Sequence, residues 1–445
     1  MLNMGERVVF FQRCIFILVF FVYSELCLSQ NSNSNIVMDQ FEEIKCTNCN
    51  KNNPAWATVN QWDPGHGVAV GSTTGSSVSI AVSRVSKNGG PVAIPPALVV
   101  YQNGILALAG QQLPNTGIVE ANGNHANKLL IADFDGNGVE DIFSANGGYD
   151  RNPFPGQTNT LWTFNNQAWT TVSIQNQAVA FNHTAAVIDL NRDGRRDVLV
   201  GLGNLSINRN NYNNYAVTFN NGQFVATTAL VDSQVNMHVV AVGDINGDGQ
   251  EDIVYGAYEQ QGLPYSGSGV LIRNASGGFT KTVFPRPEGV LAHAAGLPAI
   301  GDINGDGLAD VVMLYTPAWP STDRYRKPVV QVLLQSANGQ WTDSTSTNLI
   351  SYPGFDWADS YNTKAYLADI NSDGRLDLIL EVSEKRWDTR RAWLRVLENK
   401  NGVLTEKELF LGQDQSRIEV VDVDNNGKAD IVVHRSSGLK ILRRR

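Results

Sequence analysis

The stretch DINGDGQED, residues 244–252, has the pattern that decides the fold of this chain. Asp stands at its first, fifth and ninth positions, Asn at its third and Gly at its sixth. Six copies of the pattern, with Asp or Asn at the third and fifth positions, begin 56, 55, 58, 67 and 53 residues apart. The other copies are DFDGNGVED (133–141), DLNRDGRRD (189–197), DINGDGLAD (302–310), DINSDGRLD (369–377) and DVDNNGKAD (422–430). A near-constant period of this length predicts one supersecondary unit copied many times.

The spacing of the acidic residues predicts a metal site in each copy. Calcium takes about six to eight oxygen ligands, and side chains at alternating positions of a tight loop converge on one point. The carbonyl of the seventh residue supplies a further oxygen, and the Gly permits the sharp turn. The alternative is an acidic turn without metal, because Asp, Asn and Gly also favour ordinary turns. Magnesium is disfavoured, since it keeps more of its own water.

We therefore expect about six Ca²⁺ ions, one for each loop. The predicted ligands are Asp133, Asp135, Asn137, Val139, Asp141, Asp189, Asn191, Asp193, Arg195, Asp197, Asp244, Asn246, Asp248, Gln250, Asp252, Asp302, Asn304, Asp306, Leu308, Asp310, Asp369, Asn371, Asp373, Arg375, Asp377, Asp422, Asp424, Asn426, Lys428 and Asp430. Arg195 stands at a seventh position and needs to give only its backbone carbonyl, so its site is expected to survive. In copies one and six the Gly near Asn137 and Asn426 is interpreted as displaced by one place, which makes these two sites less favourable.

A further copy without metal ligands is expected upstream. AVGSTTGSSVSIAV (69–82) matches AVGDINGDGQEDIV (241–254), with Ser72 and Ser79 at the first and last Asp positions and a loop shorter by one residue. Ser72 lies 61 residues before Asp133, which agrees with the period. The sequence therefore predicts seven repeats, of which the first lacks calcium.

The apolar segments of each repeat predict about four strands. Gly/Asn turns such as FNNGQF (219–224) are typical of β-hairpins. Four-stranded sheets repeated radially form a β-propeller, so we predict an all-β, seven-bladed propeller of antiparallel blades. The last repeat contains only three strands, and we expect the N-terminal side, near residues 55–62, to supply the fourth and close the ring.

Over roughly residues 55–445 the chain resembles the FG-GAP/VCBS repeat family, the calcium-loop propellers of integrin α-subunit heads and some secreted lectins. The resemblance implies that the calcium loops join the first and second strands of each blade and lie on one face. It also implies that ligands are met on the opposite face or between blades. It does not identify the function, because one fold hosts many functions.

The long connections between second and third strands carry aromatic residues that are candidates for ligand binding: Tyr258, Trp319, Tyr325 and Trp387. Flat aromatic faces suit sugar rings and protein partners alike, and the alternative is that they pack against their own loops. His125, His183, His238 and His293 precede the first Asp of their loops by 8, 6, 6 and 9 residues, while Lys364 and Arg417 lie five before theirs. These residues are a candidate ring around the central channel for an anionic ligand, a metal or acid/base chemistry. The favoured interpretation is that each His hydrogen-bonds backbone at a blade junction.

The N-terminal region predicts secretion. Residues 1–29 have the basic and apolar segments of a signal peptide, with a retained anchor as the alternative. Residues 30–53 are expected to form a mobile leader, and residues 54–445 the propeller. After cleavage only Cys46 and Cys49 remain, and a local disulfide is expected because a zinc site would need two more ligands. The sequons at Asn182, Asn204 and Asn274 are candidate N-glycosylation sites.

Charge follows the metal hypothesis. The formal net charge is −9, and each of the six loops has three Asp residues at its predicted metal positions. The acidity is therefore attributed to calcium binding. No basic patch suggests nucleic acid, and no apolar stretch after the signal segment is long enough to span a membrane.

Enzyme signatures such as G-x-S-x-G, H-E-x-x-H or a P-loop do not occur in the sequence, so enzymatic activity is not the first expectation. The first hypothesis is a secreted, calcium-stabilised propeller that binds carbohydrate or glycoprotein. The alternatives are an integrin-like protein-adhesion module and a polysaccharide lyase or hydrolase acting on acidic glycans.

Overall fold

The computed structural model describes residues 41–49, 68–71, 77–82, 95–114, 126–147, 156–202, 214–228, 235–259, 267–287, 293–317, 329–350, 360–385, 390–410, 416–435 and 438–445. Contacts divide the chain into two compact units. The larger unit, Glu43–Arg443, contains all the repeats, and the smaller combines Met1–Glu42 with Arg444–Arg445. The predicted signal segment, residues 1–29, lies outside the described residues. No helix in the described ranges is long and apolar enough to cross a membrane.

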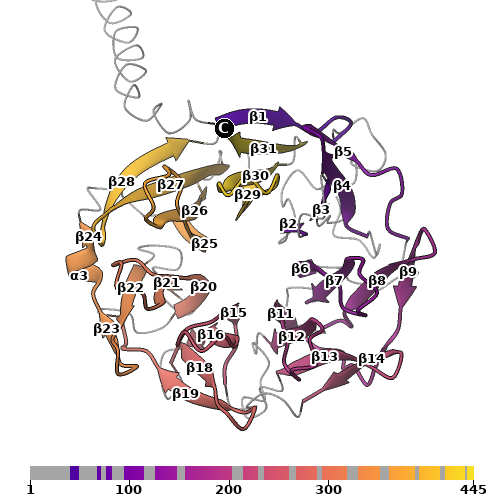
Figure 1. Ribbon diagram of the computed structural model, residues 1–445, viewed down its shortest axis with the longest axis horizontal. Coiled ribbons are helices and arrows are strands. Elements are labelled where there is room, and N and C mark those ends of the chain that lie inside the picture. Colours follow the sequence, from indigo (N-terminus) through magenta and orange to yellow (C-terminus); the bar gives the residue numbers. More distant parts are fainter. Residues whose placement is uncertain are drawn as a thin grey trace, which may run out of the picture. The chain divides into compact units, whose positions relative to one another are not determined.

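Antiparallel sheets of four strands are the building block of the larger unit (Figure 1). Three of them have the orders β2-β3-β4-β5, β6-β7-β8-β9 and β15-β16-β18-β19. Their strands are β2 (Val68–Val70), β3 (Ser77–Val82), β4 (Ala97–Gln102), β5 (Ile105–Leu108), β6 (Ala126–Ala132), β7 (Asp141–Asn146), β8 (Thr160–Asn165), β9 (Ala168–Val172), β15 (Val239–Gly243), β16 (Asp252–Gly256), β18 (Gly269–Arg273) and β19 (Phe279–Val283).

The remaining sheets add short strands to the same unit. The sheet β11-β12-β13-β14 also carries β10 parallel to β14, and a ten-stranded sheet combines β20–β23 with β25–β28 through one parallel bridge between Leu297 and Lys364. The strands of the β11 sheet are β10 (Ile174–Gln175), β11 (Asn182–Ile188), β12 (Asp197–Leu202), β13 (Tyr215–Asn220) and β14 (Gln223–Thr227). The strands of the ten-stranded sheet are β17 (Tyr258–Glu259), β20 (His293–Gly301), β21 (Asp310–Pro317), β22 (Val329–Gln335), β23 (Trp341–Asp343), β24 (Leu349–Ile350), β25 (Ser360–Ala368), β26 (Asp377–Lys385), β27 (Arg390–Lys400) and β28 (Val403–Phe410). A short helix, α3 (Thr345–Asn348), precedes β24. The last sheet has the order β1-β31-β30-β29, with β1 (Phe41–Lys45), β29 (Ser416–Val421), β30 (Asp430–Arg435) and β31 (Gly438–Arg444).

The second strand of each sheet is mostly buried, which agrees with packing of the sheet on both of its faces. In β16 all five residues are buried. Ile253 and Tyr255 belong to a core cluster shared with Leu199 of β12, whereas Val254 belongs to a cluster shared with Met313 of β21. Alternate side chains of a strand point to opposite faces, so this sheet packs against a neighbouring sheet on each side, with a separate core on each face.

The first strands of successive sheets also contact one another. Contacts join β2 to β6, β6 to β11, β11 to β15, β15 to β20, and β20 to β25, and β2 also contacts β29. The side chains of Lys364 and Tyr366 on β25 donate hydrogen bonds to the carbonyl of Ile418 on β29, at 3.3 and 2.6 Å. Two cavities lie along these first strands, one of about 460 Å³ between β20, β25 and β29 and one of about 270 Å³ between β2, β6, β11 and β29.

The register of the first sheet agrees with the predicted metal-free repeat. Val70 pairs with Ile80, and the Gly71 N–H donates to the Ser79 carbonyl at 2.8 Å. The corresponding pairs in the third loop-bearing repeat are Val242 with Ile253 and Gly243 with Asp252. Ser79 therefore occupies the place of a ninth-position Asp, and Ser72 itself lies outside the described residues.

The fourth strand of the last sheet comes from a different segment than the one predicted. Residues 55–62 lie outside the described residues, and β1 (Phe41–Lys45) pairs with β31 instead. Glu43 forms an ion pair with Lys440 at 2.7 Å, and Ile44 packs against the adjoining core. The expectation of a mobile leader over residues 30–53 is therefore wrong for residues 41–49.

The Cys46–Cys49 disulfide follows β1 directly. Within this turn the Cys46 N–H donates to Leu439 of β31, and the Thr47 N–H donates to Leu106 of β5, both at short distance (2.9 and 2.8 Å). The local pairing predicted for the two cysteines is present, and the turn joins the last sheet to the first.

Deletion of residues 1–45 should destabilise the protein, because β31 would lose its neighbour and expose an unpaired edge. We expect a melting temperature lower by several degrees and increased aggregation, measured by calorimetry and light scattering. Deletion of residues 1–40 is the matched control and should leave both unchanged. Equal stability of the two truncated proteins would contradict the role assigned to β1.

Candidate metal centres and ligand site

The six acidic loops join the first and second strands of their sheets, as the family resemblance implied. The loop at 133–141, for example, runs from β6 to β7, and the loop at 422–430 runs from β29 to β30. Every ninth-position Asp begins a second strand and has an almost fully buried side chain. The loops are therefore anchored at one end inside the core and open toward solvent at the other.

All six loops share one backbone conformation, with left-handed residues at the fourth and sixth positions. The sixth residue is always Gly, with φ between 80° and 84° at Gly138, Gly194, Gly249, Gly307, Gly374 and Gly427. The fourth position is also left-handed where it is not Gly, as at Arg192, Ser372 and Asn425 (φ 61°, 58° and 57°). The predicted displacement of the Gly in copies one and six is therefore wrong, because both loops have the common geometry.

Hydrogen bonds hold the first and ninth carboxylates in the same places in every loop. One oxygen of the first Asp accepts the N–H of the sixth residue, for example Gly249 to Asp244 Oδ2 at 2.8 Å. The ninth Asp accepts the N–H of the second residue, as from Ile245 to Asp252 Oδ2 at 2.9 Å. The seventh residue donates its N–H to the side chain at position five. The carboxylates are thus oriented by the backbone before any ligand binds.

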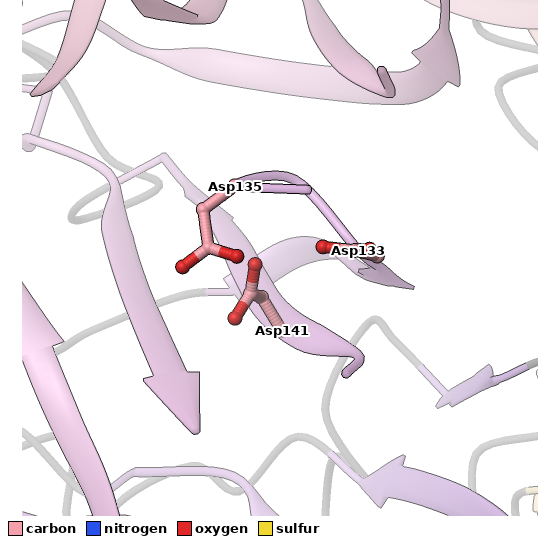
Figure 2. A group of neighbouring side chains, drawn as sticks. All are labelled: Asp133, Asp135 and Asp141. Atoms are coloured by element: carbon pink, nitrogen blue, oxygen red, sulfur yellow. The ribbon is translucent and has the colours of Figure 1, made fainter. Parts of the chain in front are cut away.

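Two loops bring three carboxylates together. Figure 2 shows the first of these groups. One oxygen from each of Asp133, Asp135 and Asp141 lies within 4.8 Å of the others, and Asp422, Asp424 and Asp430 form the second group. Among the described residues, Asp141 Oδ1 and Asp424 Oδ1 are buried and accept no hydrogen bond. A buried carboxylate oxygen without a donor is costly, and the all-oxygen donor set fits a hard divalent cation such as calcium.

The remaining loops have Asn at position three and therefore one negative charge fewer there. In the loops at 244, 302 and 369 the ninth Asp accepts a second bond, from the N–H of Arg273, Gln335 or Asn399 on the third strand. These distances are 2.7, 3.0 and 2.8 Å. The ninth carboxylate therefore ties the loop to both neighbouring strands.

Burial dominates the electrostatics of the ninth position. Burial, with repulsion from Asp135, raises the pKa of Asp141 to about 7. Burial likewise raises the pKa of Asp197, Asp310 and Asp377 to about 6. Because these folded-state values exceed the unfolded value of 3.8, the metal-free fold loses stability as pH rises from about 4 to about 7.

Two seventh-position Arg residues do more than offer a carbonyl. The Arg195 guanidinium pairs with Asp193 Oδ2 at 2.5 Å, and that of Arg375 pairs with Asp373 Oδ2 at 2.7 Å. In both loops the fifth carboxylate therefore already has a cationic partner. The expectation that Arg195 needs to give only its carbonyl to a metal stays a prediction, and the ion pair adds a contact that the loop pattern did not include.

The structure brings three of the predicted ligand-face residues together. The rings of His183 and His238 stack with centroids 3.6 Å apart, and His238 lies 5.4 Å from the Tyr258 ring. His183 Nδ1 lies 2.7 Å from the His238 carbonyl, which agrees with a backbone hydrogen bond at a blade junction. The backbone of His293 pairs with Glu259, next to Tyr258. His125, Trp319, Tyr325 and Trp387 lie outside the described residues.

One predicted glycosylation site is wrong. Asn182 is fully buried, and its Nδ2 donates to the carbonyls of Asn146, Gln157 and Ala180 at 2.8, 2.9 and 3.2 Å. A glycan on that nitrogen would require the folded core to open. Asn274 stays a prediction, and Asn204 lies outside the described residues.

A cationic layer was only partly recognised in the sequence. Lys364 and Arg417 stand five residues before the first Asp of their loops, and so does Lys128, which had not been singled out. In ANKLLIADFD, Lys128 lies the same five residues before the first Asp of its loop. Alignment of the repeats would therefore have identified it.

Comparisons with known proteins give a family and several distant folds. The model of the FG-GAP-like repeat matches residues 133–200, 189–255 and 302–380. Curated proteins gave no match. Among solved structures, a polysaccharide lyase, PL25 ulvan lyase, is 11% identical with a TM-score of 0.48, over 86% of this chain and 92% of that one. The Dos1 propeller is 9% identical with a TM-score of 0.47, over 92% and 96%, and a putative exo-β-1,3-galactanase from Bifidobacterium bifidum is 8% identical with a TM-score of 0.37, over 79% and 94%.

Replacing both competing guanidinium groups, by Arg195→Leu and Arg375→Leu, should strengthen calcium binding at loops two and five. Both ion pairs are partly exposed, so we expect roughly a two- to fivefold gain in affinity at two sites, measured by calorimetric titration. Leu308 occupies the same position in loop four, which shows that Leu is compatible with the loop. Unchanged or weaker affinity would contradict the competition.

Proposed function

The repeats at residues 133–200, 189–255 and 302–380 belong to the FG-GAP-like repeat family, and on this premise we propose that the protein is a calcium-stabilised, seven-bladed β-propeller that binds carbohydrate or glycoprotein. The observation that carries the calcium part is the convergence of three carboxylates in loops one and six. The proposal also places the protein outside the cell, where calcium is abundant enough for weak sites.

The donor sets support calcium in all six loops. The side chains at positions one, three, five and nine, with the seventh carbonyl, would hold each ion. When bound, the cation would neutralise carboxylates whose burial otherwise disfavours their charged form. The unpartnered Oδ1 atoms of Asp141 and Asp424 are the strongest support, because each needs a cation or donor that the described residues do not supply.

The sheet topology supports closure of the propeller. The four-stranded units beginning with β2, β6, β11, β15, β20, β25 and β29 would be the seven blades. Contacts between successive first strands run from β29 through β2 to β25. The hydrogen bonds from Lys364 and Tyr366 to Ile418 connect the two remaining ends of this series. Completion of the last blade by β1 would leave no incomplete blade.

The cluster of His183, His238 and Tyr258 supports glycan binding. His183 and Tyr258 are partly exposed and His238 is mostly buried, so part of the cluster is open to solvent. Asn236 donates to the Tyr258 carbonyl at 2.8 Å, while its buried Oδ1 has no hydrogen-bond partner among the described residues. Rigid aromatic faces beside an amide suit sugar rings, which offer apolar C–H surfaces and hydroxyl donors.

Calcium should raise the melting temperature of the chelator-treated protein, and Asp141→Asn should reduce that gain. A site filled at about 100 times its Kd contributes about 2.7 kcal/mol to stability. In chelator the wild-type protein should become less stable as the pH rises from 4 to 7. The pKa of Asp141 in the folded protein is about 7, so the stability of the Asp141→Asn variant should depend less on pH over this range. Calorimetry with calcium, magnesium or chelator measures both effects. A wild-type melting temperature insensitive to calcium would refute the metal assignment.

Glycan binding should depend on the aromatic cluster. We expect Tyr258→Ala to weaken binding to the best ligand of a glycan array by roughly tenfold, since stacked ring contacts contribute about 1 kcal/mol or more. Trp169→Ala, on the outer strand β9, is the aromatic control and should bind as the wild type does. Binding to protein ligands alone would favour the adhesion alternative, and turnover of uronic-acid polymers the lyase alternative.

A further inference from the structure

A layer of three cations lies at the start of the first strands β6, β25 and β29. Lys128, Lys364 and Arg417 each stand five residues before the first Asp of their loops. Leu297, at the same position of its repeat, pairs with Lys364 in the bridge between β20 and β25, so equal positions lie at equal height on neighbouring strands. The three cationic side chains therefore belong to one level of the fold.

Two of these cations have carboxylate partners. Lys364 Nζ pairs with Glu419 at 2.5 Å, and Arg417 Nη1 pairs with Glu381 Oε1 at 3.1 Å. The other oxygens are also engaged: Glu381 Oε2 accepts the Ile418 N–H at 2.9 Å, and Glu419 Oε2 accepts the Tyr366 hydroxyl at 3.2 Å. Burial raises the pKa of Tyr366 well above its ordinary value, so the phenol stays neutral.

Lys128 is the cation left over. Its side chain forms no ion pair or hydrogen bond with another residue of the described ranges, although Glu419, Glu381 and Lys364 are near enough to affect its pKa. Three cations and two carboxylates therefore meet here among the described residues, which leaves one positive charge uncompensated. Burial lowers the pKa of Lys128, and the charge of Glu419 opposes this shift only in part.

Lys128 lines the cavity of about 270 Å³ between β2, β6, β11 and β29. Among the described residues, Glu419 is the only other charged residue in its lining, and the remainder are Val, Ala, Leu and Ile residues. The charge of Glu419 is compensated by Lys364 on the adjoining strand. An anion that enters this cavity can therefore form an ion pair with the Lys128 ammonium.

We propose that this cavity binds an oxyanion group, a carboxylate or a sulfate, through an ion pair with the Lys128 ammonium. The bound anion would compensate the remaining positive charge and favour the charged form of Lys128. The group could be carried by a sugar or be a free inorganic anion, and the two sources share the same recognition chemistry. The site depends on neither calcium nor the aromatic cluster, so it can fail or succeed independently of the proposed function.

The test measures binding of sodium sulfate and sodium glucuronate to the full-length, calcium-supplemented protein by calorimetry at constant ionic strength. We expect Lys128→Met to weaken binding at least tenfold, and Lys128→Arg to keep it within a fewfold. Lys400→Met, an exposed lysine on β27, is the matched control and should bind as the wild type does. Sulfate binding alone would assign the site to a free anion, and glucuronate binding to an anionic sugar.

Stability separates this role from a structural one. Lys128→Met should melt at or above the wild-type temperature, because it removes a desolvated charge without breaking an ion pair. Should that variant fail to fold, protection of Lys128 in the wild type from acetylation by either anion decides the question. Absence of binding to the wild type, or equal affinity in Lys128→Met, overturns the proposal.

Discussion

The buried carboxylate at the ninth loop position is the interaction on which each repeat depends. Its Oδ2 atom accepts the N–H of the second loop residue in all six loops, for example Ile303 to Asp310 at 2.9 Å. In three loops its Oδ1 atom also accepts an N–H from the third strand. One side chain therefore fixes the loop against two strands of its sheet. The fold tolerates the cost of burying this charge only because hydrogen bonds, and on our proposal a cation, compensate it.

This constraint explains why the repeats can vary elsewhere. Once the ninth Asp fixes the second strand, alternate side chains of that strand must enter the two cores on either side, as Ile253 and Val254 do. The repeat without acidic residues keeps the same pairing through Gly71 and Ser79. The strand register therefore survives loss of the carboxylate, because the stacked cores on both faces supply enough apolar burial to hold the sheet.

The features that recur in every repeat could be predicted from the sequence, and the features that occur in only one repeat could not. Loop positions, strand register and the metal-free repeat followed from spacing alone. The strand at Phe41–Lys45 was missed because FEEIK is short and rich in charged residues. It has no clear alternation of apolar and polar residues that would indicate a strand. The role of the Arg195 side chain was missed because a loop pattern specifies which atoms can bind a metal, and not which neighbours compete for them. The burial of Asn182 depends on residues 25 and 36 positions away, which no local motif contains.

The same reasoning locates function where the repeats stop being equivalent. Identical repeats would have the same residue at each level of their first strands. The position five residues before the loop is instead a cation in three repeats, Lys128, Lys364 and Arg417, and Thr184, Val239 or Leu297 in three others. Apolar residues suffice for packing at this level, as Leu297 shows. Cations there impose a desolvation cost that two carboxylates offset for Lys364 and Arg417. Stability alone does not require the third cation, and a charge that the fold neither needs nor neutralises is best explained by a ligand of the opposite sign.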